Sequence, residues 1–188
     1  ARWSAKKGID LVATSDWTHP IWFREIKTYL QETSEGIFSL KQRPKEQKRN
    51  VSFLLSTEIS SIYSQGGKGR RVHNLIFSPS IATCEKIIKE LLNRGANLAS
   101  DGRPIVGVSS KDLLELCLTI DQNILFIPAH AWTPWFALFG SKSGFDSITD
   151  CFGNLAQYIY AIETGLSSDP IMNWQIKELE NRSIVSFS

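Results

Sequence analysis

The sequence predicts a single α/β domain organised as a barrel or a partial barrel. Short apolar segments alternate with segments of helical spacing along the chain, which favours repeated strand–helix units around a parallel sheet. One apolar segment, 124–129, ends at Pro128-Ala129-His130 and is followed by an aromatic loop that contains two glycines. A strand that carries a polar residue to its C-terminal end is typical of α/β barrels, in which those ends meet at one face.

Six segments have the apolar character of strands. They are 9–14, 51–57, 72–77, 124–129, 158–162 and 183–187. Helical spacing predicts helices between them, over 22–31, 80–94, 110–120, 148–152 and 170–179. The helix over 80–94 has the clearest limits, because serine is a favoured N-cap residue and glycine is favoured just after the C-terminal end of a helix, where Gly95 lies. Residues 65–71 contain three glycines and three positive charges, and this composition predicts a turn.

The composition excludes some classes of protein but does not identify a binding partner. A net charge of +2 over 188 residues neither demands nor excludes nucleic acid. The three cysteines have no CxxC spacing, which argues against a zinc knuckle or a disulfide framework and fits a reducing cytoplasmic compartment. No apolar run reaches the roughly 20 residues of a membrane span. Both ends have the character of interrupted elements, so we expect the chain to be a fragment, with 1–188 forming one domain.

Polar residues of one chemical kind gather at or near the ends of the predicted strands. If those ends share a face, imidazoles and carboxylates converge there, and these are the donors that zinc, manganese and iron bind. Metal ions in such clusters activate water for phosphoester hydrolysis, so a metal-bound hydroxide is the expected nucleophile. The candidate ligands are His19, Glu58, His73 and His130, with Asp16 and Glu163 as further candidates.

Other roles remain open for several of these residues. Glu58 or Glu163 could instead pair with Arg70 or Arg103, and Asp16 could cap its turn or orient His19. The aromatic loop could form a ligand wall or pack as core. Known catalytic signatures are missing from the sequence, including GxSxG, HExxH, GxGxxG and a complete phosphate-binding loop.

Several segments together resemble the PHP (polymerase and histidinol phosphatase) family. They are Asp16-Trp17-Thr18-His19-Pro20, Thr57-Glu58-Ile59-Ser60, Gly66-Gly67-Lys68, Val72-His73-Asn74, Ser100-Asp101-Gly102-Arg103-Pro104, the run from Pro128 to Trp135, and the run from Glu163 to Pro170. The resemblance covers almost the whole chain. Within the family, the residues are most similar to its DNA-repair nucleases.

The resemblance implies a distorted seven-stranded β/α barrel of PHP type, TIM-like in outline, with two or three metal ions. Zinc or manganese is the implied metal, with Mg²⁺ as a further candidate. By motif, His19, Glu58, His73 and His130 match family ligand positions, with Glu58 as the metal bridge, and Asp16 matches the acid of the second motif. The family also has a His-x-His on its first strand and an Asp-x-His after its last. Neither occurs in this chain, so the barrel and the metal cluster are expected to be incomplete in it.

The expected function is therefore that of a metal-dependent phosphodiesterase domain of a DNA repair endonuclease. The resemblance implies cutting on the 5′ side of deaminated bases (uracil, hypoxanthine and xanthine) or at abasic sites, in a cytoplasmic, nucleoid-associated protein. From residue type, aromatic side chains are expected to stack on a displaced base and basic ones to meet phosphates. The residues nominated for these contacts are Trp132, Trp135, Phe136, Lys68, Arg70, Arg71 and Lys142.

Two other functions fit the same residues. Some members of the family hydrolyse small phosphate esters, which makes a small-molecule phosphoesterase the first alternative. The second is a PHP-like module without metal that serves as a scaffold or binds DNA.

Overall fold

A computed structural model describes residues 1–45, 49–100, 103–165 and 170–186. Parts of the family-like segments, residues 101–102 and 166–169, lie outside the described residues, as do residues 46–48 and 187–188. The elements in chain order are α1 (Arg2–Lys7), β1 (Leu11–Ala13), α2 (Pro20–Tyr29), β2 (Leu30–Ser34), β3 (Ile37–Leu40), β4 (Ser52–Gln65), β5 (Lys68–Ser78), α3 (Ile81–Asn93), β6 (Ile105–Val106), α4 (Ser110–Ile120), β7 (Leu125–Pro128), α5 (Ile148–Phe152), the 3₁₀ helix η1 (Gly153–Tyr158), β8 (Ala161–Glu163), α6 (Pro170–Trp174), the 3₁₀ helix η2 (Lys177–Leu179) and β9 (Ser183–Val185).

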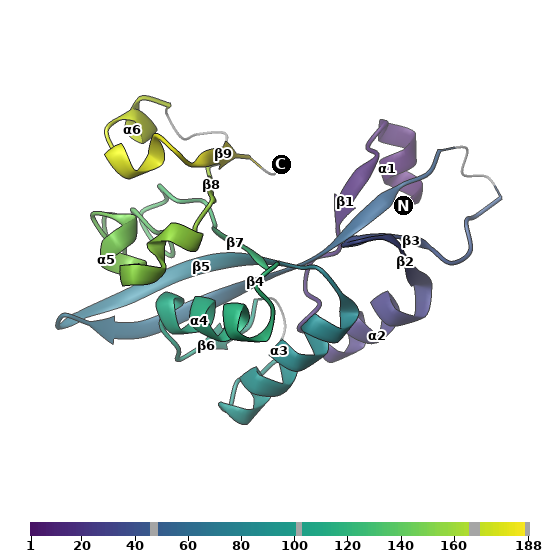
Figure 1. Cartoon of the computed structure of the whole chain (residues 1–188), viewed down its shortest axis with the longest axis horizontal. Coiled ribbons are helices and arrows are strands. Elements are labelled where there is room, and N and C mark those ends of the chain that lie inside the picture. The colour runs from purple at the N-terminus through teal and green to yellow at the C-terminus, as the bar shows by residue number, and fades with distance from the viewer. Residues whose placement is uncertain (46–48, 101–102, 166–169, 187–188) are drawn as a thin grey trace.

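A long β-hairpin of β4 and β5 runs through the molecule (Figure 1). Its strands pair antiparallel from Leu55↔Ser78 to Gln65↔Lys68, and Gly66 and Gly67 form the turn with φ of 60° and 73°. Two consecutive residues with positive φ are what a tight hairpin turn requires, and glycine adopts that backbone without strain. The turn predicted over 65–71 is therefore confirmed only at Gly66 and Gly67, because residues 68–71 belong to β5. The predicted strand end at Glu58 is wrong, because β4 continues through it.

The main sheet is mixed rather than parallel. Its order is β2-β3-β4-β5-β7 with antiparallel neighbours, while β1 and β6 pair parallel with β4. The predicted α/β class is confirmed, and the predicted parallel sheet is wrong. No closed barrel is found in the part of the chain that the structure describes.

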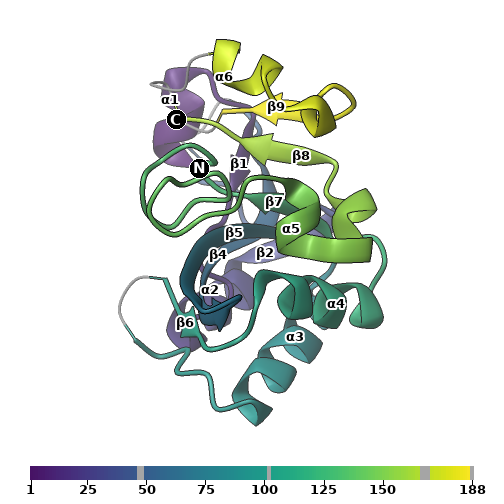
Figure 2. The ribbon, with the colours of Figure 1, turned by 90° about the vertical axis from the view of Figure 1, so that its left-hand side faces the viewer.

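Helices and a second, small sheet cover the hairpin from two sides (Figures 1 and 2). Helices α3 and α4 lie on one side, and α5 with the parallel pair β8–β9 lies on the other. Fully buried side chains from the hairpin and the two helices form one core: Leu55, Ile59, Ile76, Ile87, Leu91, Leu113 and Leu114. Ser80 caps α3 through its hydroxyl, which accepts from Thr83 N as the sequence predicts.

The described residues include no helix that is long and apolar enough to cross a membrane.

Candidate metal centre

Three candidate ligands meet beside the hairpin. His73 Nδ1 lies 2.9 Å from His130 Nε2, and the two nitrogens lie 3.2 and 3.5 Å from Glu58 Oε1. Of the described residues, these three make up the one group of His, Cys, Asp and Glu side chains with ligand atoms all within 4.8 Å of one another. The sequence nominated each of them separately, and the structure brings them together.

The register of the hairpin explains how Glu58 and His73 come to share a face. Glu58 pairs with Leu75, and Ser60 pairs with His73, so Glu58 and His73 are diagonal neighbours across the two strands. Side chains at directly paired positions lie on the same face, as do residues two apart in a strand. Both side chains therefore project from one side of the sheet.

His130 reaches the same point by a turn of the backbone. Pro128 pairs with Asn74, so a strand continued beyond Pro128 would place His130 on the face opposite to His73. The strand instead ends at Pro128, and His130 has a φ of 32°, in the left-handed region that costs energy for a residue with a Cβ. The turn brings the imidazole back to His73.

Glu163, at the end of β8, holds this turn in place. Its side chain is buried, at 8% exposure, and its carboxylate accepts a hydrogen bond from His130 N. Its backbone oxygen accepts from Ala131 N at 2.8 Å, and His130 Nδ1 lies 2.9 Å from the Thr133 hydroxyl. Glu163 is therefore a support of the His130 backbone and is not a member of the three-residue cluster.

Arg103 balances the charge of the cluster. Its Nε donates to Glu58 Oε2 at 2.8 Å, and its Nη1 lies 3.4 Å from His73 Nδ1. Burial on its own would raise the pKa of the Glu58 carboxyl, but the His130 and His73 imidazoles and the Arg103 guanidinium hold that pKa well below its usual range. Glu58 is therefore an anion at neutral pH.

The cluster has the chemistry of a metal-binding site. Glu58 Oε1 is buried, and its contacts with the two imidazoles lack hydrogen-bond geometry, so a buried anionic oxygen is left without a hydrogen-bond partner. Such an atom is costly unless a cation or a proton donor meets it. One carboxylate and two imidazoles suit zinc or manganese. The three residues fit the metal that the sequence implies.

His19 and Asp16 lie outside this group. His19 is the N-cap residue of α2, and Asp16 has a φ of 44° in the loop after β1, where its carbonyl accepts from His19 N at 2.9 Å. Both side chains are half-buried.

The aromatic loop after His130 folds tightly on itself. A Cβ on Gly144 would lie 2.6 Å from Leu138 O, and one on Gly140 would lie 2.7 Å from Thr133 O, so both positions require glycine. Phe145 N donates to Leu138 O at 2.7 Å across the loop. These contacts give the loop a defined shape next to the cluster.

The nominated aromatic residues differ in their surroundings. Trp132 is half-buried, with its ring centroid 4.7 Å from that of Phe139, and its Nε1 donates to Asn173 at 2.7 Å. Phe136 packs against the His73 ring with a centroid distance of 4.7 Å. Trp135 is 48% exposed. Phe136 therefore lies against a residue of the cluster, and its neighbour Trp135 presents an exposed ring.

The nominated basic residues also divide into two kinds. Arg70 is half-buried, donates to Gly144 O and lies 4.1 Å from the Phe145 ring centroid, so it holds the loop. Arg71 is exposed and lies over Trp135 at 5.1 Å. Lys68 and Lys142 are exposed. Arg71, Lys68 and Lys142 are thus the nominated cations with access to solvent.

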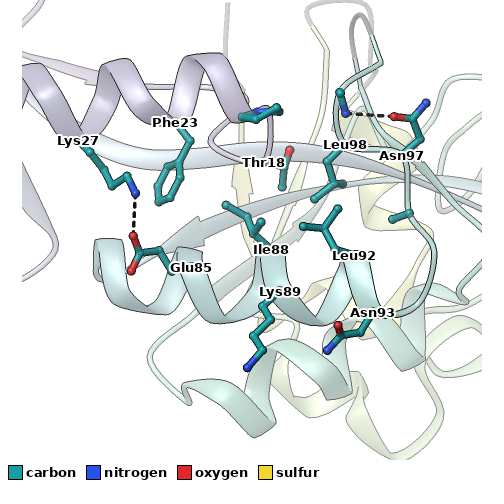
Figure 3. A pocket seen from close by; sticks show the side chains of 13 residues that line it. Thr18, Phe23, Lys27, Glu85, Ile88, Lys89, Leu92, Asn93, Asn97 and Leu98 are labelled. Carbon is teal, nitrogen blue, oxygen red and sulfur yellow. Dashed lines mark hydrogen bonds and ion pairs between the residues drawn. The ribbon is translucent and has the colours of Figure 1, made fainter.

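A separate groove of about 540 Å³ lies between α2 and α3 (Figure 3). Phe23, Ile88 and Leu92 give it apolar walls, and a 2.9 Å ion pair between Lys27 and Glu85 spans it. None of the candidate ligands lines it. The groove and the cluster are distinct features.

The cysteines take no part in the cluster. Cys84, Cys117 and Cys151 are all buried as free thiols, and burial raises the pKa of each to about 12. Thiols with such a pKa are neutral at physiological pH and pack as small apolar side chains.

Comparison with solved structures gives clear matches. PfuEndoQ from Pyrococcus furiosus, described as a lesion-specific endonuclease, aligns over 98% of this chain with a TM-score of 0.78 and 27% identity. A structure of endonuclease Q bound to a 27-mer duplex, with an abasic lesion at its active site, aligns over 98% with a TM-score of 0.79 and 29% identity. The chain is similar to endonuclease Q.

Comparison with curated sequences adds two uncharacterized proteins. YqxK of Bacillus subtilis is 30% identical over 185 residues, which cover 94% of this chain. MJ0043 of Methanocaldococcus jannaschii is 30% identical over 144 residues, or 77% of this chain. No family model matches, so the PHP assignment stays a prediction.

The chain spans only part of each of these proteins. It covers 43% of YqxK, 15% of MJ0043 and 41% of each endonuclease Q chain.

The structure confirms one alternative that the sequence left open, the pairing of Glu58 with Arg103. The sequence predicts Glu163 only as a ligand or an ion-pair partner, whereas in the structure its carboxylate accepts from His130 N. The parallel pairing of β6 with β4, Ser60↔Ile105, brings Arg103 alongside Glu58. A two-residue strand is too short to recognise in a sequence.

Proposed function

We propose that this chain is the metal-binding part of a DNA repair endonuclease. The observation that carries the proposal is the cluster of Glu58, His73 and His130, in a fold similar to that of endonuclease Q over 98% of the chain. In this proposal the chain belongs to one domain, a distorted seven-stranded barrel of PHP type.

The three clustered side chains would hold zinc or manganese, with Mg²⁺ as the further candidate. A metal at this site supplies a Lewis acid that lowers the pKa of water and neutralises charge on phosphate oxygens. Glu58 contributes the negative charge, and His73 and His130 contribute neutral nitrogen ligands. His19 and Asp16 are proposed to serve a second ion, as their match to the family motifs implies.

The substrate is proposed to be a duplex that contains a deaminated base (uracil, hypoxanthine or xanthine) or an abasic site. The abasic duplex bound to endonuclease Q supports the choice of substrate class. Phe136, which packs against His73, and its exposed neighbour Trp135 offer rings for a displaced base. Arg71, Lys68 and Lys142 offer exposed cations for the phosphates.

Cleavage by the full-length protein tests the proposal. Duplexes with one uracil or one abasic site are incubated with the protein and Mn²⁺, beside an undamaged duplex. We expect cuts on the 5′ side of the lesion, lost on chelation with EDTA and restored by Mn²⁺. Glu58→Gln should reduce cutting to background, because it removes the anionic ligand but keeps the side-chain shape. Glu25→Gln, on the exposed face of α2, should cut like the wild type.

Two results would refute the proposal. Hydrolysis of p-nitrophenyl phosphate without cutting of lesion DNA would identify a small-molecule phosphoesterase. Substantially less than one bound metal ion per chain in the purified protein, with no cutting after Mn²⁺ is added, would identify a scaffold or DNA-binding module.

A further inference from the structure

Arg103 occupies an unusual place for a cation. It contacts the outer oxygen of Glu58 through Nε and faces His73 Nδ1 through Nη1, while half of its side chain remains exposed. The same carboxylate and the same imidazole nitrogen belong to the candidate metal centre. A permanent positive charge therefore lies at the edge of a site built to hold another positive charge.

The two cations conflict at one atom. His73 Nδ1 has at most one lone pair, and it lies 2.9 Å from His130 Nε2 and 3.4 Å from Arg103 Nη1. A metal ion bound at this nitrogen would exclude both contacts. Glu58 has no such conflict, because Arg103 uses Oε2 and the histidines face Oε1. A metal ion bound to His73 would thus displace the Nη1 end of Arg103 and leave its Nε on Glu58.

The displaced guanidinium has a defined alternative use. It is half exposed and presents planar N–H donors that match two oxygens of a phosphate. Without the contact to His73, the Nη1 end of the guanidinium would be available to such an anion. A cation held by Glu58, His73 and His130 would also repel the guanidinium and so favour its contact with an anion.

We propose that Arg103 binds the scissile phosphate of the substrate and is released for this role when the metal displaces it from His73. The proposal rests on the proposed function and deepens it. It makes Arg103 oppose metal binding and support cleavage, which is a combination that a merely structural residue does not have.

Three substitutions in the full-length protein separate charge from shape. Arg103→Gln keeps an N–H donor for Glu58 but removes the charge, Arg103→Lys keeps the charge, and Arg24→Gln on the exposed face of α2 is the matched control. Mn²⁺ affinity is measured by isothermal titration without DNA. Cleavage of an abasic duplex is measured in single turnover with saturating protein and Mn²⁺.

Arg103→Gln should bind Mn²⁺ about tenfold more tightly than the wild type, because a nearby like charge is gone. It should cleave about 100-fold more slowly, the usual loss for one charge-stabilising donor. Arg103→Lys should keep wild-type Mn²⁺ affinity and recover part of the rate, and the control should match the wild type in both.

The inference is overturned if Arg103→Gln binds Mn²⁺ no more tightly than the wild type, or if it cleaves at the wild-type rate. Circular dichroism tests whether each variant is folded. If Arg103→Gln is unfolded, the cleavage rate of Arg103→Lys is compared with that of the wild type instead. A wild-type protein that binds no Mn²⁺ refutes the proposed function itself. If the wild type binds Mn²⁺ and cuts, the results for the variants decide the role of Arg103.

Discussion

Replacing Glu163 with alanine should damage the metal centre without touching a proposed ligand. The substitution removes the buried carboxylate that accepts a hydrogen bond from His130 N, and so leaves this backbone N–H without its partner. A hydrogen bond to a charged group contributes about 1.5–3 kcal/mol, so we expect the free energy of unfolding to fall by about 2 kcal/mol. For a protein of this size, this lowers the melting temperature by about 4–8 °C, and the shift is smaller for a larger protein.

The effect on metal affinity should exceed what the loss of stability explains. His130 has a left-handed backbone that depends on its surroundings, and without Glu163 it can relax to an ordinary φ. The imidazole would then turn away from His73. Loss of a group that orients a metal ligand typically lowers metal affinity 10–100-fold, and we expect Mn²⁺ affinity to fall by that amount in isothermal titration.

A second carboxylate provides the control. Glu178 accepts hydrogen bonds from Ile148 N at 2.6 Å and from Thr149 N at 3.2 Å, and so holds the start of α5 in the way that Glu163 holds His130. Glu178→Ala should also lower stability, as measured by urea unfolding, but should leave Mn²⁺ affinity unchanged. Equal Mn²⁺ affinity in Glu163→Ala and the wild type would refute the role given to Glu163.

Three further results are expected. Gly144→Ala should lower the melting temperature by several degrees, because its Cβ would meet Leu138 O at 2.6 Å, while Gly69→Ala, with nothing within 4 Å, should leave it nearly unchanged. Trp135→Ala should weaken binding of a uracil-containing duplex by about 1–3 kcal/mol in fluorescence anisotropy, with no change in melting temperature, since the ring is half exposed. Lys142→Ala should reduce the slope of log affinity against log salt by about 1, and an unchanged slope would remove this residue from the phosphate contacts.

Some local elements of the fold could be predicted from the sequence, but the strands β2 and β3 and the pairing of the strands could not. The limits of α3 follow from Ser80 and Gly95, which act on their own neighbours. The course of β4 was missed at Glu58, since a charged residue after an apolar run resembles a strand end. Two adjacent glycines between apolar segments are a known hairpin signal, and reading Gly66-Gly67 that way would have given the antiparallel pairing.

The same contrast holds for the site. His73 and His130 could be predicted as ligands because the chain has only three histidines, and Glu58 because it directly follows a predicted strand. The orientation of His130 could not be foreseen, because it depends on a φ of 32° and on Glu163, 33 residues further along the chain. Arg103 reaches Glu58 because β6 pairs with β4, and a strand of two residues is too short to be recognised in the sequence.

The hairpin turn gives the centre a sensitivity to changes in chain length far from it. Glu58 and Gly66 are eight positions apart in an extended strand, which corresponds to about 25 Å. A shift of one strand against the other by one residue would move side chains to the opposite face. His73 would then leave Glu58 although every ligand was still present. An insertion at the hairpin tip should therefore abolish metal binding if it shifts the register by one residue, and should leave metal binding intact if it only lengthens the loop.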